Sequence, residues 1–244
     1  MEVHHHPELP HGENKKFKEY VLEFLMIFLA VTMGFIAENI REHFSDSAKE
    51  NEYITGMIKN LQDDTANLKV MIRLNQQQVN GIDSLRKVNR DKLTEIKVQD
   101  SLYRLTSMYI YHADDFRNNE ITLTQLRNAG GYRLIKNEGI LNSIAVYETK
   151  IHDLNEEYNG MFASLQKIRE DANFIFDLNI GHKFRLNPSS TPVLITYDKE
   201  KIYNYYNRCW LASLSLDGYI HMMRDQLKYS TRLIAYLKKE YNVE

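Results

Sequence analysis

The stretch that decides the fold is residues 140–175, ILNSIAVYETKIHDLNEEYNGMFASLQKIREDANFI. Apolar side chains recur in it at alternating steps of four and three, which places them along one face of an α-helix; such a row is called a heptad seam here. The seam has no charged member and consists of Ile140, Ile144, Tyr147, Ile151, Leu154, Tyr158, Met161, Leu165, Ile168, Ala172 and Ile175. It predicts a long helix packed nearly parallel to its neighbours.

Two further seams lie on either side of this stretch in the chain. One consists of Ile202, Tyr206, Cys209, Ser213, Leu216, Ile220, Met223, Leu227, Ser230, Ile234, Leu237 and Tyr241. The other consists of Ile54, Ile58, Leu61, Thr65, Leu68, Ile72, Asn75, Val79 and Ile82, and its spacing can be continued backwards to Ala37. Shorter helices are predicted around residues 98–109 and 123–126, the second ending at Gly130-Gly131. The fold class is therefore all-α, with an antiparallel, four-helix-like bundle over residues 41–244.

Residues 178–199, LNIGHKFRLNPSSTPVLITYDK, interrupt the helical pattern. Pro188 and Pro192 bracket a turn signal, and the segment that follows is rich in strand-forming residues. We therefore expect a long loop or small hairpin inserted between the two best-defined helices. Such a loop is either a contact surface for a partner or ligand, or a spacer at the bundle tip.

An apolar run, YVLEFLMIFLAVTMGFIA at residues 20–37, predicts a transmembrane anchor over residues 18–40. A cleaved signal peptide is the weaker interpretation, because no small-x-small site precedes a plausible mature start. A buried or interfacial helix is the other alternative, since the uninterrupted part is short. Lys15, Lys16 and Lys18 flank the run on its N-terminal side, so the positive-inside rule predicts a cytoplasmic N-terminus and a periplasmic bundle at a bacterial inner membrane.

Two features of the anchor are candidates for function. Glu23 lies about one turn inside it, where a carboxylate either carries protons or ions, or pairs near the lipid headgroups. Ala30 and Gly34 have the small-xxx-small spacing that allows transmembrane helices to approach closely, which favours self-association. The expected partners are thus the lipid bilayer and a second copy of the chain or an envelope protein.

The N-terminal residues 1–17 form a His-rich tail in which His4, His5, His6 and His11 are candidate metal ligands. Ordering a flexible tail costs entropy, so disorder is the competing expectation.

The single cysteine supplies neither an intramolecular disulfide nor a Cys-pair zinc site. The net charge of -2 argues against nucleic-acid binding. The sequence contains no phosphate loop, nucleophile elbow or zinc-protease motif, so we expect neither an enzyme nor a cofactor.

Aromatic residues cluster where the last predicted helix begins. Tyr203, Tyr205 and Trp210 are predicted to form a face for a partner or ligand, whereas Tyr206 lies on the seam and is expected in the core. Two pairs spaced four apart, Glu148 with His152 and Asp217 with His221, are interpreted as ion pairs on helix surfaces.

Two segments carry a likeness to a known family. Residues 22–42, LEFLMIFLAVTMGFIAENIRE, and residues 122–135, TLTQLRNAGGYRLI, together with the His-rich start, make the chain resemble an uncharacterised family of single-pass membrane proteins from Bacteroidota. The resemblance implies an anchored helical protein at a bacterial inner membrane and no catalytic residues. Two functions remain: an anchored scaffold, accessory or partner-binding module that self-associates, or a metal-handling or transport-associated protein that uses the His tail and Glu23.

Overall fold

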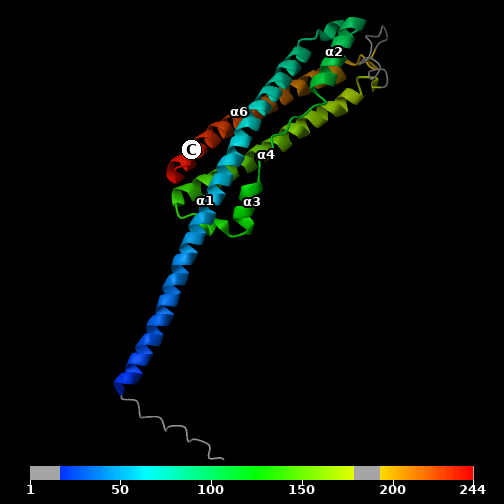
Figure 1. The fold of residues 1–244 in the computed structure, drawn as a ribbon. Helices are drawn as coiled ribbons and strands as arrows, with labels where there is room; N and C mark the ends of the chain where they lie inside the picture. The colour runs from blue at the N-terminus through cyan, green and yellow to red at the C-terminus, as the bar shows by residue number, and fades with distance from the viewer. Residues whose placement is uncertain (1–16, 179–192, 244) are drawn as a thin grey trace, which may run out of the picture. The chain divides into compact units, whose positions relative to one another are not determined.

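The computed structural model describes residues 17–178 and 193–243. Within these residues the elements are helices, and one isolated antiparallel β-bridge joins Phe176 to Leu194. The prediction of an all-α fold is therefore confirmed (Figure 1). The elements are α1 (Phe17–Arg86), η1 (Arg90–Lys92), α2 (Ile96–Tyr109), α3 (Ile121–Asn128), η2 (Gly131–Leu134), α4 (Glu138–Asn173) and α6 (Lys199–Tyr241).

The chain divides into two units, Met1–Glu50 and Asn51–Glu244. The described part of the first unit is helical throughout, and its apolar side chains from Phe17 to Phe44 are largely exposed. Among the described residues one helix, α1, is long and apolar enough to cross a membrane, and its apolar window lies near the N-terminus with no residue buried. A helix with apolar residues on all sides and no protein around it is typical of a membrane span.

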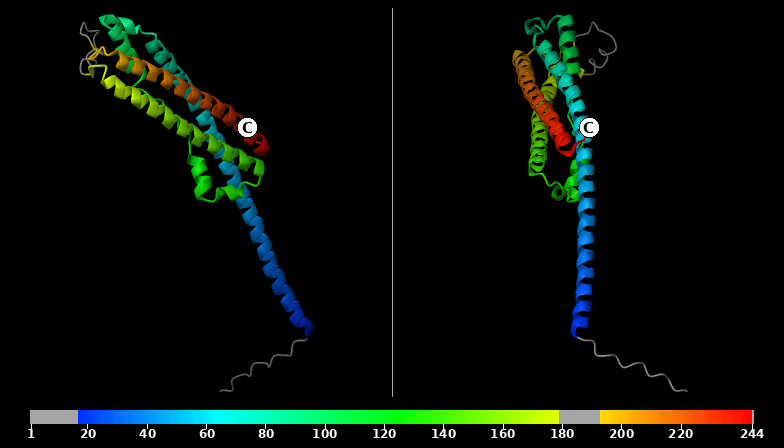
Figure 2. Two further views of the ribbon diagram at one scale, coloured as in Figure 1. Left: turned by 180° about the vertical axis from the view of Figure 1, so that it is seen from behind. Right: turned by 60° about the vertical axis from the view of Figure 1, so that its left-hand side comes forward.

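The second unit is built on three long helices, the latter part of α1 with α4 and α6. The last two run antiparallel and side by side in both views (Figures 1 and 2). Every member of the 140–175 seam is buried except Tyr158, which is partly exposed. The two other seams also face the core, where polar members such as Asn75 and Ser213 are buried among the apolar ones. The heptad spacing thus predicted the buried faces of all three helices.

Local sequence explains where the long helices begin. The Asn137 side chain accepts hydrogen bonds from the backbone N–H groups of Gly139 (2.9 Å) and Ile140 (3.3 Å) at the start of α4. Asp198 does the same for the N–H of Glu200 (2.9 Å) at the start of α6. Asn and Asp are favoured at this position because they satisfy N–H groups that have no partner within the helix. The predicted break after α3 is confirmed at Gly130, whose φ of 64° is strained for other residues.

The fourth side of the bundle consists of three pieces in series. These are α2, residues 111–120 and α3, and the middle piece, which has no helical structure, is called the linking segment. Its backbone groups pair with side chains of the long helices. Gln78 Nε2, for example, donates to the carbonyl oxygens of Tyr109 (2.7 Å) and His112 (2.9 Å). Buried backbone groups must be paired in this way when no helix or sheet supplies the partner.

Asp64 is the side chain of this group that joins two long helices to the linking segment. Its Oδ1 atom accepts the backbone N–H of Asn119 at 2.7 Å, and its Oδ2 atom accepts the Tyr147 hydroxyl at 2.5 Å. Burial raises the pKa of the Asp64 carboxyl, and these two hydrogen bonds oppose that rise. Asp64 therefore ties α1, α4 and the linking segment together. A tyrosine of α6, Tyr219, adds a third anchor by accepting the N–H of Phe116 at 3.0 Å.

The predicted insertion at 178–199 lies mostly outside the described residues, including both of its prolines. Its described end pairs with the chain just after α4, where the N–H of Asp177 donates to the carbonyl of Val193 at 2.8 Å. The Gln99 side chain from α2 accepts the N–H groups of Val193 (3.0 Å) and Leu194 (3.3 Å). The strand-like residues expected here thus form one bridge that is held against the bundle.

Candidate partner-binding site

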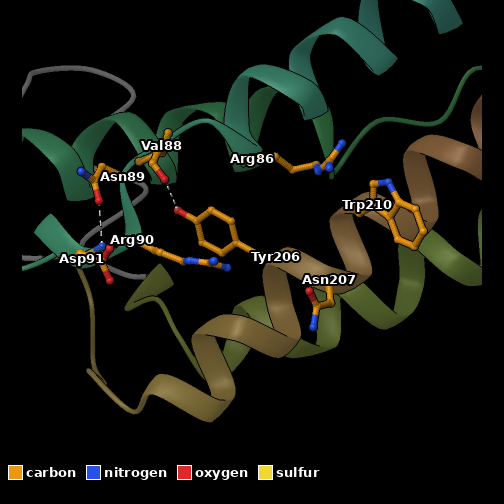
Figure 3. A pocket seen from close by; sticks show the side chains of 8 residues that line it. All are labelled: Arg86, Val88, Asn89, Arg90, Asp91, Tyr206, Asn207 and Trp210. Carbon is orange, nitrogen blue, oxygen red and sulfur yellow. Dashed lines mark hydrogen bonds between the residues drawn. The ribbon is translucent and has the colours of Figure 1, made fainter.

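A cleft of about 440 Å³ lies in the second unit between the end of α1 and the first turns of α6 (Figure 3). One wall is the turn that follows α1, from Arg86 to Asp91. The other wall is α6, from which Tyr206, Asn207 and Trp210 reach the cleft. It is called the cationic-aromatic cleft, because two arginines and two aromatic rings line it.

The turn after α1 is held by short-range hydrogen bonds. The N–H of Val88 donates to the carbonyl of Leu85 at 3.0 Å, and the Asn89 side chain accepts the N–H of Asp91 at 3.0 Å. Asn is favoured before a helical turn for this reason, so the sequence itself specifies η1. The Tyr206 hydroxyl then donates to the carbonyl of Val88 at 3.1 Å, as drawn in Figure 3, which fixes α6 against the turn.

Two guanidinium groups, of Arg86 and Arg90, line the cleft together with the Asp91 carboxylate. The Arg90 guanidinium lies over the ring of Tyr203, 4.0 Å from the ring centroid, a cation–π contact that leaves its N–H donors at the surface. Arg86 pairs with Asp83 at 3.0 Å, and both side chains are more than a third exposed. Exposed pairs of this kind are weak, so Arg86 is available to another carboxylate at little cost.

Apolar side chains extend from the cleft along the outer face of α6. The exposed fractions of Tyr203, Trp210, Leu211 and Leu214 are 40%, 45%, 52% and 49%. These four residues are called the outer stripe. The predicted role of Tyr203 and Trp210 as a partner face is compatible with this exposure and stays a prediction.

Tyr205 does not belong to that face. Its exposed fraction is 0%, and its hydroxyl lies 2.5 Å from Thr106 Oγ1 of α2. Its ring packs edge-on against Phe176, with 6.0 Å between the ring centroids. The prediction that Tyr205 meets a partner is therefore wrong. The reason is geometric. Tyr205 lies one turn before the buried Cys209, at the edge of the seam, and it is buried because α6 packs over a wider arc than the seam alone indicates.

The remaining candidates lie apart from the cleft in sequence. His4, His5, His6 and His11 fall outside the described residues. Glu23, Ala30 and Gly34 lie on α1 in the first unit, and no heavy atom of a neighbouring segment comes within 4 Å of a Cβ built on Gly34. Within the residues that the structure describes, no three His, Cys, Asp or Glu side chains gather to hold a metal ion.

The two predicted i,i+4 pairs have other partners. Glu148 accepts the Tyr132 hydroxyl at 2.9 Å and pairs with Arg127 at 3.3 Å. His221 lies 3.7 Å from Asp225, one turn further along α6 than expected from the pairing with Asp217. Both predictions failed for the same reason. A surface side chain can pair with any oppositely charged neighbour within reach, and the residue four positions away is one of several such neighbours.

Sequence reasoning missed Arg86 and Arg90. A basic residue at the end of a long helix interacts favourably with the helix dipole, so its presence there does not by itself indicate a binding site. Nothing in the spacing of residues 86–90 indicates that the chain turns back to meet Tyr203 and Trp210, more than a hundred residues later in the sequence. The contact follows from the antiparallel return of α6.

Comparison with known proteins adds no relative: no model of a protein family, no curated protein and no solved structure matches the chain. The resemblance to a Bacteroidota membrane family therefore stays a prediction from the sequence.

Proposed function

We propose that the protein is a membrane-anchored, non-enzymatic helical bundle that binds a protein partner through its outer stripe and cationic-aromatic cleft. In this role it acts as a scaffold or accessory subunit. The anchor is the apolar part of α1, and the bundle is the second unit, residues 51–244. The sequence features that indicate orientation put the N-terminus in the cytoplasm and the bundle in the periplasm of a bacterial inner membrane.

The observation that carries this proposal is the exposure of Trp210 with its apolar neighbours on the outer stripe. Exposed apolar area costs about 25 cal/mol per Å², and a single apolar side chain at a surface needs no explanation. A row of exposed apolar side chains that contains a tryptophan is different, because tryptophan and tyrosine are enriched at the centres of protein interfaces. The row also continues into a cleft, which supplies the concave shape that an anchoring side chain needs.

The charges beside the stripe indicate the chemistry of the partner. Arg86 and Arg90 present guanidinium donors at one edge of the apolar row, and guanidinium groups bind carboxylates with two parallel hydrogen bonds. The partner surface is therefore an apolar row bordered by Asp or Glu. Such an arrangement places the apolar contacts at the centre and the ion pairs at the rim, as in ordinary protein interfaces.

Photo-crosslinking in living cells tests partner binding. A photoreactive benzoylphenylalanine replaces Trp210 in one strain and Asn142, an exposed residue of α4, in a control strain. We expect a protein adduct from position 210 and none from position 142 after irradiation. Equal labelling at both positions, or no adduct at position 210, would contradict the proposal.

Thiol labelling tests the orientation. Cys209 is buried and burial raises its pKa to about 12, so the native thiol does not react with a maleimide at neutral pH. Asn142→Cys and Glu2→Cys variants are treated with a membrane-impermeant maleimide after permeabilisation of the outer membrane. We expect Asn142→Cys to label and Glu2→Cys to label only after lysis. The reverse result would place the bundle in the cytoplasm.

A further inference from the structure

We propose that the partner of the outer stripe is a second copy of this chain, and that the two α6 helices pack side by side in parallel. The inference deepens the function proposed above and rests on it, since it names the occupant of the same surface. It goes beyond that function because it fixes the register and direction of the contact.

The outer face of α6 carries a heptad seam of its own. Tyr203, Asn207, Trp210 and Leu214 follow one another at steps of four, three and four, and all of them are exposed. The core seam lies on the other side of the helix, where Tyr206, Cys209 and Leu216 are buried. A helix with one seam in its own core and a second seam facing solvent is suited to pack against another helix on its outer side.

The outer seam ends abruptly along α6. The positions that continue it after Leu214 are Asp217 and His221, and both are exposed. His221 is paired with Asp225 at 3.7 Å, so this half of the outer face is charged and solvated. The apolar contact is therefore confined to the first half of the helix, over about three turns.

Asn207 determines the direction of packing. An asparagine in a heptad seam favours a parallel pair, because its amide then meets the same amide of the other chain and the two hydrogen-bond. In an antiparallel pair centred on this seam, Asn207 would lie against Trp210 of the second copy and Tyr203 against Leu214. The amide would then be covered by an indole without a hydrogen-bond partner, at a cost of about 1–3 kcal/mol.

The two flanks of the seam carry different charged groups, and the parallel arrangement brings them together. One flank is the end of α1, with Arg86 and with Arg90 over the Tyr203 ring. The opposite flank is the end of α4, where Asp171 lies 3.1 Å from Arg208 and next to the exposed Glu170. A two-fold axis along parallel α6 helices brings the α1 flank of each copy beside the α4 flank of the other. Arg86 and Arg90 of one copy thus lie on the side of Glu170 and of the Asp171–Arg208 pair of the other copy, and Glu170 is the carboxylate for which no ion pair is described on this flank.

Anchoring explains how so short a seam suffices. Four partly exposed side chains offer less than the roughly 800 Å² per partner that a stable soluble complex buries. Two chains anchored in one membrane meet at a much higher effective concentration than in free solution, so a weak contact is populated. The proposal therefore expects a dimer in the membrane that dissociates readily in dilute detergent.

Cysteine crosslinking in isolated membranes of the full-length protein tests the pairing. The variants are Leu214→Cys, the double variant Tyr203→Cys with Leu214→Cys, and Asn142→Cys as an exposed control; the native chain, with its buried Cys209, is the background. Disulfides form only when the two Cα atoms come within about 7 Å, so the products report register. Oxidation with copper phenanthroline is followed by gel electrophoresis without reductant.

A parallel pair predicts that Leu214→Cys alone gives most of its product at twice the monomer mass and that Asn142→Cys gives at least tenfold less. A product from the double variant with none from Leu214→Cys alone would show an antiparallel pair and overturn the proposal. No dimer from either variant, combined with adducts to a different protein at position 210, would overturn the second copy as partner while the proposed function stands. No adduct of any kind at position 210 would overturn both the second copy as partner and the proposed partner-binding function.

Discussion

Two regions of the bundle reverse the usual distribution of polar and apolar residues. Around the linking segment polar side chains are buried, whereas on the outer stripe of α6 apolar side chains are exposed. The first reversal is largely explained within the chain, because Asp64, Asn75 and Gln78 each pair with a backbone group of the linking segment that no helix satisfies. The second has no explanation within the described chain and indicates a contact with another molecule. The comparison separates residues that hold the fold from residues that we propose serve an interface.

The largest effect on stability is expected at Asp64. Asp64→Ala leaves the Asn119 N–H and the Tyr147 hydroxyl without an acceptor inside the bundle, and each unpaired buried donor costs about 1–3 kcal/mol. We expect the free energy of unfolding to fall by about 3 kcal/mol, measured by urea denaturation of the full chain in detergent. Gln62→Ala, at a nearby exposed position of α1, is expected to change it by less than about 0.5 kcal/mol. Equal losses would contradict the role of Asp64.

A smaller loss is expected at Gln78, whose amide nitrogen donates to the carbonyl oxygens of Tyr109, the last residue of α2, and of His112 in the linking segment. Gln78→Leu keeps the volume and removes both hydrogen bonds, so the free energy of unfolding falls by about 1–2 kcal/mol. Gln77→Leu is the matched control on the exposed side of α1. Slower amide exchange in residues 109–112 of the Gln78→Leu variant than in the native chain would refute this assignment.

The pH dependence of stability is expected to carry a contribution from Asp64. Burial raises its folded-state pKa, with Asp63 adding to the rise and Tyr147 and the Asn119 N–H opposing it. A carboxyl with a raised folded-state pKa binds its proton more tightly when folded, so its contribution is present below the unfolded pKa and is lost as pH rises through the folded one. Asp64→Asn removes this contribution. The free energy of unfolding of the native chain and of the Asp64→Asn variant is measured by denaturation at a series of acidic pH values. The two proteins should show the same change of this free energy with pH outside the window between the unfolded and folded pKa of Asp64, and a different change inside it.

The smallest effect on stability is expected at the outer stripe. Trp210→Ala removes an exposed indole, so thermal unfolding in detergent should match the native chain within about 0.5 kcal/mol. Adduct formation from benzoylphenylalanine at position 203 should nevertheless fall at least fivefold, because the central anchor of the contact is gone. A variant that lost stability and kept its adducts would show that Trp210 belongs to the core. Lys228→Ala, on the charged half of α6, is expected to change neither quantity.

The heptad seams were a sound guide to the buried faces of the three long helices. They were less informative about what replaces the fourth helix, because residues 111–120 have no periodicity and their burial depends on partners far away in sequence. Asn75 illustrates the difference. Its place on a seam predicted that it faces the other helices, whereas the pairing of its amide nitrogen with the carbonyl oxygen of Asp114, at 3.2 Å, appears only in the structure.

The sequence predicted some residues of the candidate site and missed others. The aromatic cluster near residue 205 pointed to the right end of α6, and Tyr203 and Trp210 are exposed there. The same argument failed for Tyr205, because a helix that packs on two sides buries a wider arc than one seam describes. The sequence argument also omitted Arg86 and Arg90. These residues lie near α6 only because the chain folds back and α6 packs beside the end of α1.

What the sequence determined by itself is whatever depends on near neighbours: the helices and their buried rows, the Asn and Asp caps, the break at Gly130 and the apolar segment of α1. These follow from backbone periodicity and from side chains that act within one or two turns. The tertiary structure alone decided how Asp64 and Gln78 hold the linking segment, why Tyr205 is buried, and that the turn after α1 forms a cleft with α6. Those contacts join residues many turns apart, and their geometry exists only after the helices have packed.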